Sequence, residues 1–186
     1  MKINKERNLI IPIIRDDGSK VYVHSIPISQ AVFVAFHAVL AKAFSALTDN
    51  GINPYAGLST AKYAIIDAAA ALDDSERVQS GFIGEIRRIT TVLFAGEHGF
   101  EPIMLGDAIK RGIIDEEETE EVENAICFFI LSMRLFLKSK RPILVEAITS
   151  LGGYLTTSLQ AMEWHASLEN SISDTVTRET TSSIAC

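Results

Sequence analysis

Histidines and nearby carboxylates are the side chains of this chain with the greatest capacity for acid–base or metal chemistry. The four histidines are His24, His37, His98 and His165. They are scattered, and no pair has the spacing that places two imidazoles on one helical face. One constellation remains as an alternative, an enzyme that uses His98, Glu101 and Asp107 with a metal, although these residues lack ligand spacing. The pattern favours a non-enzymatic protein with no catalytic residue, no cofactor and no bound metal.

The two cysteines, Cys127 and Cys186, support neither a disulfide framework nor a zinc site. Cys127 stands between Ile126 and Phe128 in an apolar block, which predicts a buried and inert thiol. The chain also has no Gly-x-Ser-x-Gly sequence, so no activated serine is indicated. Nucleophilic catalysis is therefore not predicted.

The segment from Asp115 to Leu137 begins with DEEETEEVE and continues as AICFFILSMRLFL. Asp115 followed by Glu118 predicts a capping box, and clustered acids at a helix N-terminus are favoured by the helix dipole. Calcium binding is disfavoured because the ligand alternation and central glycine of a calcium loop are missing. The helix is apolar on almost every side, so we expect it to be central or to lie at an interface.

The sequence indicates that this helix and two later aromatic residues bind a partner protein. Buried aromatic and apolar side chains dominate protein interfaces. For Tyr154 and Trp164, a role in the core or in covering the hairpin is the favoured interpretation, and anchoring a partner is the alternative. The candidate partner-binding residues are Phe128, Leu131, Leu135, Tyr154 and Trp164.

Length and charge restrict the class of protein. The 186 residues suit one domain, and a net charge of −7 with a pI near 5.1 argues against binding nucleic acid. No apolar run approaches the length of about 20 residues that a membrane span requires. The N-terminal sequence lacks the apolar core of a signal peptide, so we expect a cytoplasmic protein.

The expected fold is mainly α, a single helical domain of about five to six helices with an N-terminal β-hairpin. The domain covers residues 1–168, the hairpin covers 8–28 and turns at Asp17-Gly18, and Pro12 marks an edge or an interruption of its strand. Residues 169–186 are polar and are expected to form a flexible tail. The expected helices begin or run as follows: from the Ser29 cap to Asn50-Gly51, 59–72, 75–93, 105–111, 115–137, 143–151 and, with mixed signals, 154–168.

The helix expected over 75–93 has a complete apolar stripe, formed by Val78, Phe82, Ile86, Ile89 and Leu93. Glycine in a helix costs about 1 kcal/mol relative to alanine. Gly81 and Gly84 therefore indicate close approach of another segment. The glycine-containing segment 95–102 that follows is expected to be a loop.

Three stretches in this order resemble a family of tail assembly chaperones from long-tailed bacteriophages. They are IPIIRDDGSKVYVHSIPIS, then GEIRRITTVL with IMLGDAIKRGIIDEEETEEVENAICFF, and finally TTSLQAMEWHASL. The resemblance covers roughly residues 8–168 and consists of packing and capping patterns with no chemical signature.

The resemblance implies a small acidic protein in the host cytoplasm that binds the helical tape-measure protein and assists assembly of tail-tube subunits around it. Homo-oligomers are possible under this interpretation. Such chaperones commonly have a longer form made by a ribosomal frameshift, and the start of the polar tail suits that junction. The alternative is a structural minor tail or head-tail connector protein of the virion.

Overall fold

The protein contains a five-stranded antiparallel sheet with the strand order β4-β3-β2-β1-β5. In the computed structural model, the described residues are 7–49, 54–96, 99–137, 139 and 141–168. The strands are β1 (Asn8–Ile14), β2 (Lys20–Ser25), β3 (Thr90–Gly96), β4 (Gly99–Met104) and β5 (Leu155–Thr157). The prediction of a mainly α domain with only an N-terminal hairpin is therefore wrong, and the fold is α/β.

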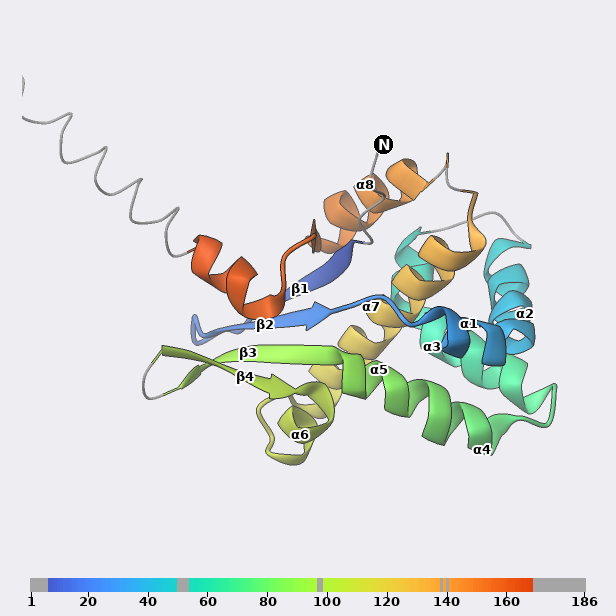
Figure 1. Cartoon of the computed structure of the whole chain (residues 1–186), viewed down its shortest axis with the longest axis horizontal. Coiled ribbons are helices and arrows are strands. Elements are labelled where there is room, and N and C mark those ends of the chain that lie inside the picture. The colour runs from blue at the N-terminus through green and yellow to red at the C-terminus, as the bar shows by residue number, and fades with distance from the viewer. Residues whose placement is uncertain (1–6, 50–53, 97–98, 138, 140, 169–186) are drawn as a thin grey trace, which may run out of the picture.

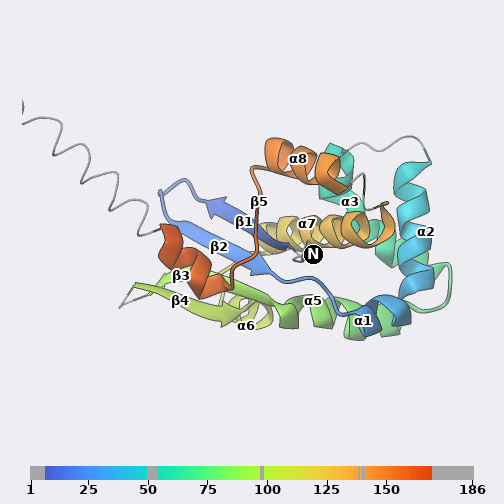
Figure 2. The same ribbon diagram turned by 45° about the horizontal axis from the view of Figure 1, so that its top comes forward.

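Helices gather beside the sheet and against one of its faces (Figures 1 and 2). They are α1 (Gln30–Ala35), α2 (His37–Thr48), α3 (Pro54–Ala70), α4 (Ser75–Arg77), the π-helix η1 (Val78–Ile83), α5 (Gly84–Ile89), α6 (Leu105–Lys110), α7 (Glu116–Leu135) and α8 (Arg141–Gly152). A further helix covers residues 161–168. Within the described residues, no helix combines the length and apolar character that crossing a membrane needs.

The N-terminal hairpin is confirmed. β1 and β2 pair antiparallel from Leu9 with Ser25 to Ile14 with Lys20, and Gly18 in the turn has a φ of +81°. β5 pairs with β1 only at Asn8 to Ile10, so Pro12 lies where β1 has no strand on that side. A proline there removes no hydrogen bond from the β1–β5 ladder.

The long helix α7 begins as predicted. The Asp115 side chain accepts from the Glu118 backbone N–H at 2.8 Å, and the Glu118 carboxylate accepts from the Asp115 N–H at 3.1 Å. Arg15 at the hairpin turn donates to both oxygens of Glu118, at 2.7 and 2.8 Å. The capping box and this bidentate pair therefore fix the start of α7 to the hairpin.

The segment 75–93 is only partly as predicted. Val78 and Phe82 of η1 are buried, as are Ile86 and Ile89 of α5. The chain then becomes strand β3, so the prediction of a loop over 95–102 is wrong for residues 95–96 and 99–102, which belong to β3 and β4. Residues 97–98 lie outside the described residues. At Gly81 a Cβ atom would lie 2.9 Å from the Phe36 ring, which confirms close packing there, whereas nothing lies within 4 Å of a Cβ at Gly84.

The two faces of the sheet have different surroundings. On the inner face, Leu9, Ile11, Val21, Val23 and Val92 belong to the main core together with the helices. On the outer face, a separate smaller cluster is covered by the helix over 161–168. The sequence predicts a helix over the whole segment 154–168. That prediction is wrong for Leu155–Thr157, which form β5. Two other predicted features, the polar tail over 169–186 and the end of the first helix at Asn50-Gly51, lie outside the described residues.

Candidate functional site

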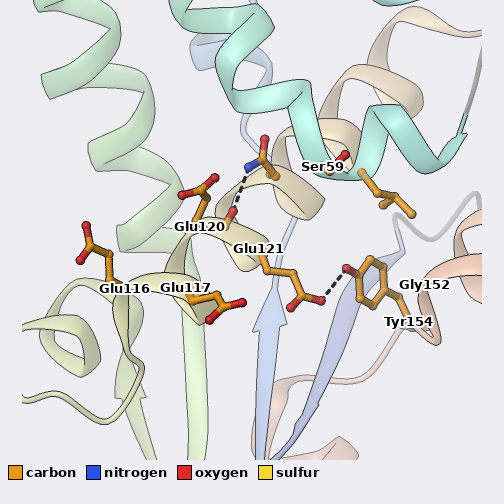
Figure 3. A pocket seen from close by; sticks show the side chains of 9 residues that line it. Ser59, Glu116, Glu117, Glu120, Glu121, Gly152 and Tyr154 are labelled. Atoms are coloured by element: carbon orange, nitrogen blue, oxygen red, sulfur yellow. Dashed lines mark hydrogen bonds between the residues drawn. The ribbon is translucent and has the colours of Figure 1, made fainter.

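An acidic groove lies between the first turns of α7, the start of α3 and the end of α8 (Figure 3). Its cavity volume is about 790 Å³. Four exposed carboxylates of α7 form one wall, and an apolar residue and a buried aromatic residue contribute to the opposite side. The residues that line the groove include Leu58, Glu116, Glu117, Glu120, Glu121 and Tyr154.

The geometry of α7 determines why its carboxylates share one wall. Residues 116 and 120, like 117 and 121, are four apart and lie one helical turn above each other. The N-terminal dipole of α7 favours this negative charge. The groove therefore presents a concentrated negative field that attracts cationic groups of a partner.

Two tyrosines join the carboxylates through hydrogen bonds. Tyr154 donates its hydroxyl to Glu121 Oε1 at 3.3 Å, as Figure 3 shows. Burial, and then the charge of Glu121, raise the pKa of Tyr154 well above its ordinary value. A hydrogen bond with Glu120 likewise raises the pKa of Tyr63. Both shifts favour the protonated phenol, so Tyr154 and Tyr63 serve as hydrogen-bond donors to these carboxylates.

A buried ion triad connects the helices α3, α5 and α7. Glu123 of α7 has no exposed surface, and its Oε1 accepts from Arg87 Nε of α5 at 2.6 Å. The Lys62 ammonium of α3 lies 2.8 Å from Oε2, without the alignment of a hydrogen bond. Asn124 adds a second tie, because its Oδ1 accepts from the Lys62 backbone N–H at 2.9 Å. The triad is structural, since both cations are already paired with Glu123.

The structure separates the five residues predicted to bind a partner. Phe128 and Leu131 are buried and border an apolar cleft with Phe44 and Phe136, whose volume of about 10 Å³ leaves no room for a partner side chain. Leu135 is half-buried beside the main core. Partner binding by these three residues stays a prediction, and it requires opening of the core.

The other two predicted residues lie at different places. Tyr154 lines the acidic groove, although only 4% of its surface is exposed. Trp164 packs against the outer face of the sheet, which agrees with the favoured interpretation that it covers the hairpin. Only Tyr154 among the five therefore belongs to the acidic groove.

The burial of Phe128 also changes how a client surface can be tested. The sequence suggests that serine at Phe128 and Leu135 would remove a binding surface and leave the fold intact. Phe128 is a member of the main core, and truncating a buried phenylalanine costs about 3 to 5 kcal/mol. Lost binding in such a variant would therefore report unfolding as readily as a lost contact.

Among the described residues, no group of three or more histidine, cysteine, aspartate or glutamate side chains is arranged to hold a metal ion. His98, the central residue of the metal alternative, lies outside those residues. Cys127 is fully buried, and burial raises the pKa of its thiol well above the ordinary value. The predicted burial of Cys127 is thus confirmed.

Sequence reasoning missed the groove and the ion triad. It explained the acids of α7 by capping, and it had no means of placing Tyr154 opposite Glu121. Glu123 carried a usable signal, because it stands four residues before Cys127 and so continues a face interpreted as apolar.

Comparison of the chain with protein-family models, curated proteins and solved structures finds no match.

Proposed function

We propose that this protein is a non-enzymatic assembly chaperone of a long-tailed bacteriophage, and that its acidic groove binds a basic helical segment of the tape-measure protein. Tail-tube assembly around that client takes place in the host cytoplasm under this proposal. The family resemblance supplies the identity of the client, and the groove is the observation that supports protein binding.

The chemistry of the groove supports this choice of partner. Glu116, Glu117, Glu120 and Glu121 are all exposed, so a partner reaches them without opening the fold. Lysine or arginine residues four apart on a client helix match the one-turn spacing of these carboxylates. Leu58 and the Tyr154 ring provide apolar contact beside the charges, as in helix-in-groove recognition.

The experiment is co-expression with the tape-measure protein encoded in the same phage, followed by affinity purification of this chain. Changing the four groove glutamates to glutamine is expected to reduce the recovered client at least tenfold. The matched control neutralises four exposed carboxylates elsewhere, Asp16, Asp67, Glu76 and Glu146, and changes net charge equally. Equal client recovery with both variants would contradict the groove as the binding site.

A structural virion protein is the second candidate, and the sheet edge supports it. Within the described residues, β4 pairs with β3 on one side only, so its other edge offers backbone groups to a neighbouring subunit. Quantitative mass spectrometry of infected cells and of purified virions separates the two functions. A chaperone is abundant in the cells and missing from virions, whereas a tail or connector subunit is retained in fixed copy number.

A further inference from the structure

The outer face of the sheet is covered by one short helix, residues 161–168, which we call the strap helix (Figures 1 and 2). Two of its own side chains, Trp164 and His165, are buried against the sheet. Ala161 and Leu168 of the same helix are half-buried and pack against the cluster of Ile10, Leu93 and Trp164. This spacing of three, four and seven residues is that of one helical face. The strap helix is therefore amphipathic, with an aromatic side chain at its centre.

The contacts under the strap helix are separate from the main core. The Trp164 ring lies 5.2 Å from the Tyr22 ring, and the His165 ring lies 4.3 Å from the Phe100 ring, measured between centroids. Trp164 is buried together with Ile10 and Leu93, and no residue of the strap helix belongs to the core on the inner face. Release of the strap helix consequently leaves the packing of the main core intact.

One carbonyl group fastens the segment that leads into the strap helix. The Leu159 carbonyl accepts from Asn8 Nδ2 at 2.8 Å and lies 3.0 Å from His24 Nε2. Both partners are buried side chains of the outer face, on β1 and β2. The attachment thus combines a polar contact at the Leu159 carbonyl with aromatic and apolar packing along the helix.

The outer face of the sheet is wider than the strap helix. Cross-strand pairing places Leu155, Ile10, His24, Thr91 and Met104 in one row across the five strands. The two ends of this row, Leu155 and Met104, are 46% and 49% exposed, while Ile10 near its middle is buried. The strap helix therefore covers the centre of the outer face and leaves an exposed apolar side chain at each end of this row.

We propose that this outer face is a second docking surface, whose partner is an amphipathic helix with a central aromatic side chain. The strap helix occupies the surface until that partner displaces it. The strap helix itself shows which chemistry fits, and the open ends of the row give a longer helix additional contacts. This inference goes beyond the acidic groove and does not depend on it, because the two surfaces share no residue.

The test uses a fluorescein-labelled peptide with the sequence of residues 158–168 and follows its fluorescence anisotropy on titration with the full chain. The chain's own strap helix competes with the peptide at an effective concentration of about a millimolar, so the wild-type chain is expected to bind the peptide weakly. Trp164→Ala loosens the strap helix and increases the fraction of open molecules. Apparent affinity rises in proportion to that fraction, and we expect an increase of at least tenfold.

Two further variants show whether binding occurs at the outer face. Adding Phe100→Ser to the Trp164→Ala chain is expected to abolish peptide binding, because Phe100 forms part of the receiving surface. Met162→Ala changes an exposed position of the same helix and is expected to leave the affinity at the wild-type value. Equal affinity of the wild-type and Trp164→Ala chains for the peptide would overturn the proposal. Dimer formation by the Trp164→Ala chain would also overturn it, because it would assign the outer face to the strap helix of a second copy.

Hydrogen exchange of the wild-type chain provides a readout that needs no variant to fold. The amides of 161–168 are expected to exchange through a local opening while those of β2 and β3 stay protected. Exchange of both groups only through global unfolding would show that the strap helix cannot leave on its own, and would refute the proposal.

Discussion

Replacing Lys62 by methionine should destabilise the protein more than any other single change in the buried ion triad. The variant keeps most of the aliphatic stem and removes the ammonium group that lies 2.8 Å from Glu123 Oε2. Glu123 is completely buried, so its carboxylate would retain only Arg87, on the other oxygen. Leaving a buried charge without its partner costs about 3 to 5 kcal/mol.

The burial of the two cations predicts an order of effects within the triad. The Lys62 side chain is 18% exposed and the Arg87 side chain is 38% exposed. Arg87→Met should therefore cost less than Lys62→Met, because water reaches the more exposed site and can replace part of the contact that Arg87 makes with Glu123. The loss of unfolding free energy in Glu123→Gln should lie between the losses in these two variants, at about 2 to 3 kcal/mol. No buried charge is stranded in this variant, because both cations are partly exposed and can be solvated by water.

Urea unfolding followed by circular dichroism measures these free energies by linear extrapolation. A loss of about 3 kcal/mol corresponds to a fall in Tm of about 6 to 12 °C for a chain of this size. The double variant Lys62→Met with Glu123→Met should lose less than Lys62→Met alone, because no buried charge is stranded. If Lys62→Met costs under about 1 kcal/mol, or no more than Arg87→Met, the argument that Glu123 is a desolvated charge is refuted.

Three further measurements test other parts of the structure. Gly57→Ala would place a Cβ atom 2.2 Å from the Phe128 ring and should lower stability by about 1 to 3 kcal/mol in the same urea assay; an unchanged midpoint would show that this contact is looser. Cys127 should resist thiol reagents until the protein unfolds, because burial raises the pKa of its thiol; peptide mass spectrometry after brief labelling of the native protein would reveal any reaction. Arg15 holds the pKa of Glu118 below its ordinary value of 4.5, so this pair contributes its full stability above pH 4.5 and loses it as the pH falls through the lowered pKa. Arg15→Met should therefore flatten the curve of stability against pH in this acidic range. An unchanged slope would argue against the pair.

Local signals in the sequence predicted the elements whose causes are local. The Asp17-Gly18 turn, the Asp115 and Glu118 capping box and the Ser29 cap of α1 all depend on residues within a few positions of each other. Each element appears where its signal placed it, although α1 and α2 are divided at Phe36. Interactions over such short spans do not require knowledge of the remaining chain.

The second half of the sheet could not be predicted in the same way. Thr90 and Thr91 directly follow a helical stripe, and their strand forms because β2, about 65 residues earlier, offers an open edge. Likewise, the groove needs Tyr154 to lie beside Glu121, and the triad needs Lys62 and Arg87 to meet at Glu123. These contacts depend on tertiary packing, which periodicity in one segment does not encode.

Isothermal titration of the purified chain with the purified tape-measure protein, at low and at high salt, tests the proposed function most directly. A basic client held by the acidic groove predicts saturable binding that weakens as salt rises, and further weakening when Glu116, Glu117, Glu120 and Glu121 become glutamine. Absence of binding, or an affinity that neither salt nor these four substitutions change, would contradict the account.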